Sequence, residues 1–290
     1  MGRIAVVVHE EKVAALGDGD PCELLRAAVE AREWPEPVFY PTSSSDAGAE
    51  ATRTALAEGA ELVVVCGGDG TLNACAQGLI GSGVPMAVIP VGTGNLVAGN
   101  LGVPQDPATA VATAVSGTDH DLDLGQTPEG VIVGMAGVGL DAAMVQDAPH
   151  WLKRRVGWPA YAVSLFRHLA DRGFTAVVEV DGEPVTYRHV RTVVIGNVGA
   201  LHGGLSLFPD ARPDDGILEV AVLAPRTVLG WIPMAARLLA KRAGSIPVRK
   251  GRHIVVTADR TLRRETDGEA LPDGRVMEVT VAPGALRLRR

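Results

Sequence analysis

Two glycine-rich segments carry the residue types that bind phosphate. Gly67-Gly68-Asp69-Gly70-Thr71 directly follows the apolar run 62–66, and Gly92-Thr93-Gly94-Asn95 follows the apolar run 86–90. Glycine tolerates positive φ and lets a ligand approach the backbone, and a helix that begins after such a turn offers unpaired N–H groups. Asp69 adds a carboxylate that can hold Mg²⁺ or a hydroxyl beside the phosphates. Together these features indicate a phosphotransfer site.

The elements around both segments predict a single crevice. Each apolar run reads as a buried strand, and each glycine turn leads into a helix. Upstream, a strand at 4–8, a helix at 21–33, a strand at 38–40 and a helix at 46–58 complete a β-α alternation. This alternation is typical of a parallel sheet covered by helices, in which ligands bind at the carboxyl ends of the strands.

Neither turn matches a common nucleotide motif. A Walker sequence needs a lysine before its Ser/Thr, and the dinucleotide fingerprint is GxGxxG. No lysine occurs between Lys12 and Lys153, so these turns carry no lysine clamp of their own. We expect backbone amides and a metal ion to carry the phosphate charge instead.

The second half of the chain reads as a mostly β domain, which we expect to be a sandwich. Turns such as Asp181-Gly182 and Asp273-Gly274 separate its predicted strands, and helical stretches at about 143–171 and 226–242 interrupt them. We place an α/β three-layer domain at 1–122 and the β domain at 123–282, with residues from about 283 to 290 packing back onto the first. The predicted strands of the second half are 131–133, 176–180, 193–195, 218–222, 253–256 and 276–281.

Composition and charge limit the classes of protein to which this chain can belong. The chain has 290 residues, of which 47% are hydrophobic and 21% charged, enough for one large or two medium cores. No apolar stretch has the roughly 18 residues of a membrane span, and three cysteines without a signal peptide favour reduced thiols. We therefore expect a soluble, cytoplasmic protein. The formal net charge is −7, which disfavours a nucleic-acid partner.

The positive charge is concentrated in the second half. Residues 1–122 carry 5 Lys/Arg and 16 Asp/Glu, whereas residues 123–290 carry 22 and 18. Two basic groups stand out, and aromatic residues flank the first. An anionic membrane surface attracts such groups, although solvated helix faces have the same composition. The groups are Lys153, Arg154 and Arg155 beside Trp151, Trp158 and Tyr161, and the run Arg237, Lys241, Arg242, Arg249, Lys250 and Arg252.

Taken in order, these motifs resemble the diacylglycerol kinase catalytic-domain family, a group of soluble bacterial lipid kinases with sphingosine and ceramide kinase relatives. The Gly-Gly-Asp-Gly motif alone is shared with NAD kinases and phosphofructokinases, and the further segments make the resemblance specific. These segments are 90–95, 121–125, 136–142, Gly203-Gly204, 209–211, 214–218 and Asp267-Gly268-Glu269.

The resemblance implies ATP, Mg²⁺ and particular residue roles. Asp267 would be the general base, with Asp69 also at the chemistry and Glu269 assisting metal or nucleotide placement. Thr42 would contact the nucleotide. Asp215, with the carbonyls of Arg212 and Ile217, would bind a structural Mg²⁺. His202 would face the acceptor cleft, with a surface or core position as its alternative.

Simpler interpretations stay open for the three aspartates. Asp267-Gly268-Glu269 also reads as an ordinary hairpin turn, and Asp69 as a helix-capping carboxylate. The stretch around Asp215 also reads as a turn before a strand.

Two departures from the family pattern affect nucleotide binding. The family commonly has Asn-Pro-x-Ser-Gly after its first strand, where this chain has His9-Glu10-Glu11-Lys12. An arginine expected after the second glycine turn is replaced by Gly99. These losses predict weaker ATP affinity, an altered nucleotide preference, or recruitment of Lys12 as a substitute.

These observations lead to one expected function and two alternatives. We expect an ATP- and Mg²⁺-dependent kinase that phosphorylates a lipid hydroxyl, foremost that of diacylglycerol, at the inner face of the plasma membrane without spanning it. A NAD kinase-like enzyme and a catalytically weak lipid-binding or regulatory protein are the alternatives. The sequence leaves the oligomeric state open, with a homodimer as one option.

Overall fold

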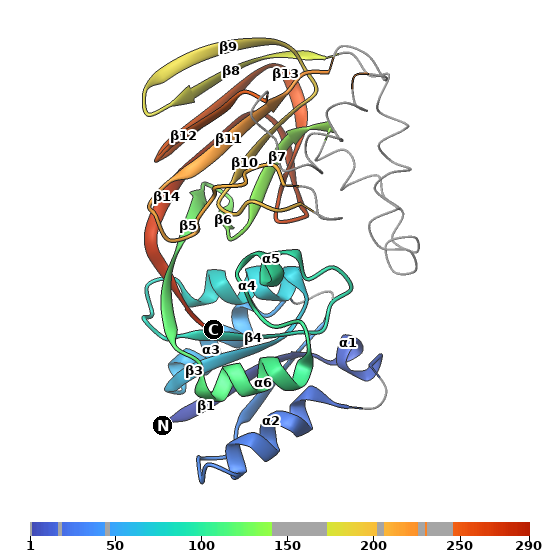
Figure 1. The fold of residues 1–290 in the computed structure, drawn as a ribbon, viewed down its shortest axis with the longest axis vertical. Coiled ribbons are helices and arrows are strands. Elements are labelled where there is room, and N and C mark those ends of the chain that lie inside the picture. The colour runs from blue at the N-terminus through green and yellow to red at the C-terminus, as the bar shows by residue number, and fades with distance from the viewer. Residues whose placement is uncertain are drawn as a thin grey trace. The chain divides into compact units, whose positions relative to one another are not determined.

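The computed structural model describes residues 2–16, 19–43, 47–140, 173–201, 206–225, 230 and 246–290 (Figure 1). The chain divides into two compact units. Unit 1 comprises Met1–Leu122 and Gly284–Arg290, and unit 2 comprises Asp123–Pro283. The chain passes between the units twice, once within β5 (Asp119–Thr127) and once within β14 (Glu269–Arg289).

Unit 1 contains a parallel sheet in which β1, β3 and β4 are largely buried apolar runs. Its strand order is β4-β3-β1-β2, and the end of β14 lies beside β4, where Leu288 pairs with Met86. Such runs are typical of parallel strands that are buried on both faces. The strands are β1 (Arg3–His9), β2 (Val38–Thr42), β3 (Ala60–Gly67) and β4 (Met86–Pro90).

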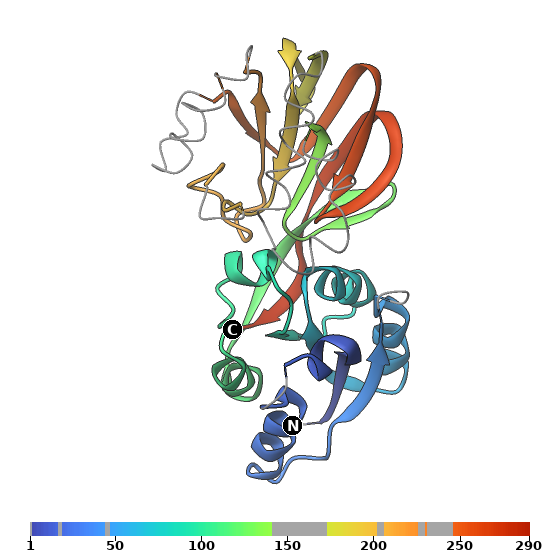
Figure 2. The same cartoon turned by 90° about the vertical axis from the view of Figure 1, so that its right-hand side faces the viewer.

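Helices cover both faces of this sheet (Figures 1 and 2). α2 (Pro21–Glu30) and α6 (Pro107–Ser116) pack with one face in a common core, and α3 (Ala49–Ala57) and α4 (Asp69–Leu79) cover the other. α2 and α6 each begin with a proline after a capping aspartate, which fits the preference of helix N-termini. The α/β three-layer fold predicted for this part of the chain is confirmed.

The strand order creates a switch point between β1 and β3. The chain leaves β1 through the short helix α1 (Glu10–Ala14) and then α2 on one face, whereas it leaves β3 through α4 on the other. Loops that leave neighbouring parallel strands toward opposite faces open a crevice at the carboxyl edge of the sheet. His9 and Gly67, the last residues of β1 and β3, flank this point.

Unit 2 is the predicted β-sandwich, and its long strand β13 belongs to both sheets. Residues 254–258 of β13 pair with β8, and residues 264–266 pair with β7. The register shifts between these halves, as at a bulge that lets a strand change sheets. β13 spans His253–Thr266, and the other strands are β6 (Gly130–Ile132), β7 (Met135–Gly139), β8 (Phe174–Val180), β9 (Glu183–Val190), β10 (Thr192–Gly196), β11 (Leu218–Leu223) and β12 (Val248–Gly251).

One predicted turn is wrong, and its cause is local. Asp181-Gly182 joins β8 to β9 with positive φ at both residues, as predicted. Asp273-Gly274 instead lies inside β14, opposite a register shift in β13. There the Arg264 guanidinium donates to the carbonyls of Pro272 and Val276, and it occupies the space that a side chain on Gly274 would need. The predicted helical stretches 143–171 and 226–242 lie almost wholly outside the described residues.

Adjacent leucines of α2 provide a matched test of the unit 1 core. Leu25 is fully buried, whereas Leu24 is 38% exposed. We expect Leu25→Ala to lower the free energy of unfolding by about 2–5 kcal/mol and Leu24→Ala to change it by no more than about 0.5 kcal/mol. Urea unfolding of the full chain, followed by circular dichroism, measures both, and equal losses would contradict this packing.

Candidate functional site

The Asp69 carboxylate joins the two glycine turns. Asp69 is the first residue of α4, and its Oδ2 and Oδ1 accept the backbone N–H groups of Leu96 and Val97 at 2.9 and 3.0 Å. These amides begin α5 (Leu96–Asn100), the short helix after the second turn. Asp69 is therefore a capping carboxylate, but the helix that it caps is α5 and not α4, to which it belongs. Each of its oxygens can accept a further bond beyond these two.

The two turns also touch through their backbones. A Cβ placed on Gly92 would lie 2.8 Å from the Gly68 Cα and 2.6 Å from Asn95 Oδ1. Asn95 closes the second turn, because its Oδ1 accepts the Gly92 N–H at 2.9 Å and its own φ is +44°. Only glycine therefore fits at position 92.

The remaining predicted nucleotide residues lie at the same sheet edge. Thr71 is buried and packs against Gly67, and Gly70 lies in the first turn of α4. Thr93 and Gly94 are exposed in the second turn. Buried Thr42 ends β2, opposite His9 of β1. The predicted nucleotide residues of unit 1 thus lie at or just after the ends of β2, β3 and β4, with β1 between β2 and β3.

Two further residues lie at this edge: sequence reasoning did not raise His9 as a site residue, and it named Lys12 only as one possible substitute for the missing nucleotide contacts. His9 is buried, its Nδ1 has no partner in the described part of the chain, and burial followed by the nearby Lys12 charge lowers its pKa. Lys12 of α1 reaches the first turn, since a Cβ placed on Gly68 would lie 2.9 Å from Lys12 Nζ. A lysine therefore does approach these turns, from the short helix α1 after β1.

In unit 2, Asp267 lies at the tip of the β13–β14 hairpin. Asp267 and Gly268 have φ of +48° and +83° and form a two-residue turn between Thr266 and Glu269. The hairpin interpretation of this motif is therefore correct for the backbone. The side chain does more than a turn requires. It accepts N–H groups from the β6–β7 turn at 2.7–2.8 Å, those of Val133, Gly134 and Met135.

Two glutamates flank Asp267 along the chain. Glu265 is buried, and its Oε2 accepts the Gly268 N–H at 2.8 Å. Glu269 is exposed at the start of β14, and partial desolvation of its carboxyl raises its pKa. Sequence reasoning missed Glu265. Glu265 pairs with Ala270 and Glu269 pairs with Thr266, so the two glutamates lie on opposite faces of the hairpin, and their alternating positions in the sequence gave no signal of a shared face.

Asp215 occupies an exposed turn before β11. Its Oδ1 accepts the Ile217 N–H at 3.1 Å, as in an Asx turn. Buried Asp123 supports this turn, because its Oδ2 accepts the Gly216 N–H at 2.6 Å. Within the described residues no group of at least three His, Cys, Asp or Glu side chains gathers as metal ligands. Metal binding by Asp215 stays a prediction, and His202 lies outside the described residues.

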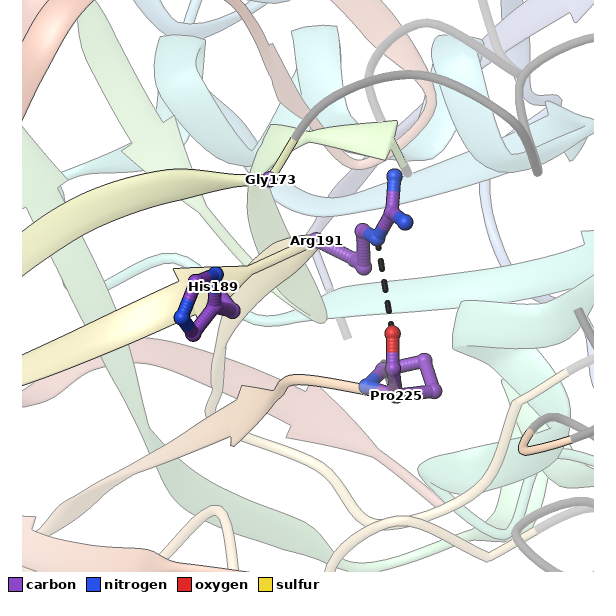
Figure 3. A pocket seen from close by; sticks show the side chains of 4 residues that line it. All are labelled: Gly173, His189, Arg191 and Pro225. Carbon is purple, nitrogen blue, oxygen red and sulfur yellow. Dashed lines mark hydrogen bonds between the residues drawn. The ribbon is translucent and has the colours of Figure 1, made fainter. Parts of the chain in front are cut away.

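Unit 2 also contains a cavity of about 230 Å³, lined by Gly173, His189, Arg191 and Pro225 (Figure 3). Arg191 Nε donates to the Pro225 carbonyl at 3.4 Å, and its buried Nη1 has no partner within the described part of unit 2. The described lining includes none of the predicted site residues.

In the described part of the basic run, Arg249 and Lys250 interact with other residues of unit 2. Lys250 forms an ion pair with buried Glu219, which raises the pKa of Lys250, and Arg249 donates to the Val178 carbonyl. Arg252 is exposed. Residues 151–161 and 237–242 lie outside the described residues. Among the described helices, none has the length and apolar character needed to cross a bilayer.

Gly92 of the second turn and Gly99 of the helix that follows it provide a matched test of the contact between the turns. Gly92→Ala should cost about 1–3 kcal/mol of unfolding free energy, because the new methyl group meets Gly68 and Asn95. Gly99→Ala should be neutral or stabilise by up to about 1 kcal/mol, since Gly99 is helical and its nearest neighbour would be 3.9 Å away. Thermal unfolding compares them. Equal stability of both variants would show that the turns do not touch.

Comparison with known proteins agrees with this architecture. Residues 5–127 match the family described as "Diacylglycerol kinase catalytic domain", and residues 133–290 match the "YegS C-terminal NAD kinase beta sandwich-like domain". A diacylglycerol kinase from Bacillus anthracis has a similar solved structure, with a TM-score of 0.79, 23% sequence identity, and coverage of 99% of this chain and 96% of that chain. At this identity the structural similarity shows the fold.

Two curated relatives are more similar in sequence. A protein of Pseudomonas fluorescens named "Probable lipid kinase YegS-like" is 32% identical over 277 residues, which cover 92% of this chain and 90% of the relative. The "Diacylglycerol kinase" of Bacillus subtilis is 30% identical over 202 residues, which cover 68% and 66%. The family resemblance inferred from the motifs is confirmed: the chain belongs to the diacylglycerol kinase catalytic-domain family, with its YegS-type β-sandwich.

Proposed function

We propose that this protein is an ATP-dependent lipid kinase that transfers the γ-phosphate to the hydroxyl of diacylglycerol, giving phosphatidic acid. Membership of a family whose relatives are named lipid kinases supports a kinase of this class. Diacylglycerol is the acceptor named for the Bacillus subtilis relative. We extend that acceptor to this chain as part of the proposal, with the lipid presented at a membrane surface.

The proposed nucleotide site is the carboxyl edge of the unit 1 sheet. Its glycine turns expose backbone to an approaching phosphate chain, and Lys12 supplies a positive charge beside Gly68. The residues present also suit Mg²⁺, which typically binds one or two carboxylates together with substrate phosphates. Asp69 is the carboxylate at this edge, and its two amide bonds leave acceptor capacity on both oxygens. When bound there, Mg²⁺ would neutralise part of the phosphate charge.

The observation that carries the proposed chemistry is the fixed Asp267 carboxylate. Three backbone N–H groups hold it in one orientation at a turn with positive φ. A general base must be held in the position from which it takes its proton. In the proposed step the lipid hydroxyl gives its proton to Asp267, its oxygen forms a bond to the γ-phosphorus, and the bond from that phosphorus to the ADP oxygen breaks.

A radiolabelled-ATP assay in mixed detergent micelles tests the function directly. The acceptors should include diacylglycerol, monoacylglycerol, ceramide and sphingosine, with NAD in a separate aqueous reaction. Thin-layer separation should show label in phosphatidic acid. Label in the NAD product alone would establish the NAD kinase-like alternative. If calorimetry detected no heat of binding at millimolar Mg-ATP, the result would favour the alternative of a catalytically weak lipid-binding or regulatory protein.

Asp267→Asn tests the proposed base. Loss of the proton acceptor should lower kcat by roughly 10²–10⁴-fold while the affinity for Mg-ATP stays near that of the wild type. The amide has one oxygen where the carboxylate has two, so at least one of the three backbone bonds is also lost. Steady-state kinetics with saturating lipid, together with calorimetry of Mg-ATP binding, separates turnover from binding.

The matched control is Asp273→Asn, which makes the same change at an exposed position of unit 2. This variant should keep wild-type turnover. If Asp267→Asn also kept it, Asp267 would have no part in the chemistry and would serve only to hold the β6–β7 turn.

A further inference from the structure

Lys12 is a half-buried cation that lacks a direct partner. No hydrogen bond or ion pair engages its ammonium group within the described part of the chain. Its Nζ lies over the first glycine turn, 2.9 Å from the position of a Cβ on Gly68, and the same Cβ would be 3.2 Å from the Gly92 Cα. The ammonium group is therefore close to the contact between the two turns.

The topology explains why Lys12 reaches this place. Lys12 lies three residues beyond the end of β1, and Gly68 lies one residue beyond the end of β3. β1 and β3 are adjacent parallel strands whose chains leave toward opposite faces of the sheet. A side chain from the loop after β1 and the backbone of the turn after β3 therefore meet in the crevice where such sheets bind ligands.

The electrostatics of the site favour an added anion. Burial lowers the pKa of Lys12, and the charge of Asp69 opposes this shift without reversing it. The Asp69 oxygens bond to the amides of Leu96 and Val97, and neither makes an ion pair with Lys12. A cation withdrawn from water without a direct counter-charge costs stability unless a ligand compensates it. Buried His9 beside it, with its unpartnered Nδ1, adds a second polar group without a partner.

We propose that Lys12 binds the phosphate chain of ATP and takes the place of the Asn-Pro-x-Ser-Gly contacts that this chain lacks. The inference rests on the proposed ATP-dependent function. Lys12 is the only lysine in the sequence of unit 1, whose residues 1–122 are otherwise strongly acidic. A triphosphate would meet both requirements of the site. It supplies the counter-charge of the ammonium group, and it passes over glycines at which a side chain would obstruct it.

Lys12→Met tests this role because it removes the charge and keeps most of the apolar stem. We expect the Kd for Mg-ATP to rise at least about tenfold, while the Kd for adenosine, which has no phosphate, stays unchanged. The melting temperature without ligand should stay equal or rise, because an uncompensated buried charge is removed. A merely structural lysine would give the opposite change in melting temperature. Lys12→Arg should retain affinity within about threefold of the wild type.

Calorimetry and thermal unfolding of the full chain provide the measurements, with Arg53→Met as the matched control. Arg53 is an exposed cation of unit 1 whose ion pair with Glu50 spans 3.0 Å on α3, and its loss should leave the Kd for Mg-ATP unchanged. Wild-type affinity in Lys12→Met would overturn the role of Lys12 and leave the proposed function standing. A wild-type protein that binds no Mg-ATP would overturn both. A wild-type protein that binds Mg-ATP through Lys12 and phosphorylates no lipid would refute only the proposed function.

Discussion

The architecture of the candidate site depends on one carboxylate that accepts two backbone amides. Asp69 lies in the first glycine turn, yet it bonds to the amides of Leu96 and Val97 beyond the second. This interaction fixes the distance between the two turns, and it explains why Gly68 and Gly92 must pass each other without side chains. A group that caps a helix and also faces a ligand can serve both purposes, because each carboxylate oxygen accepts more than one bond.

In unit 2, an aspartate carboxylate again accepts several backbone amides. Asp267 sits on a β-hairpin instead of a helix, and its oxygens hold three amides of the β6–β7 turn. Buried Glu265 holds the amide of Gly268 in the same hairpin. Backbone N–H groups thus orient the carboxylates, which avoids the flexibility of side-chain partners. The fixed orientation suits the proton-accepting role that we propose for Asp267.

Strands and glycine turns were readable from the sequence because they depend on local chemistry. Apolar runs followed by glycine predicted β3, β4 and both turns, and Asp267-Gly268 predicted a tight turn. Contacts between distant segments were not readable. The bonds from Asp69 to amides beyond the second turn depend on β3 lying beside β4, and the approach of Lys12 to the first turn depends on β1 lying beside β3. The wrong turn at Asp273-Gly274 has the same cause, since Arg264 on the partner strand keeps that segment inside β14.

The central claim is that the two glycine turns of unit 1 together cradle the phosphates of ATP. Nuclear magnetic resonance of ¹⁵N-labelled protein, titrated with Mg-ATP and separately with adenosine, tests it most directly. The account predicts that Mg-ATP shifts the backbone amides of residues 67–71 and 92–95 most strongly, and that adenosine leaves them nearly unchanged. Saturable Mg-ATP binding that leaves the amides of both turns unshifted would contradict it.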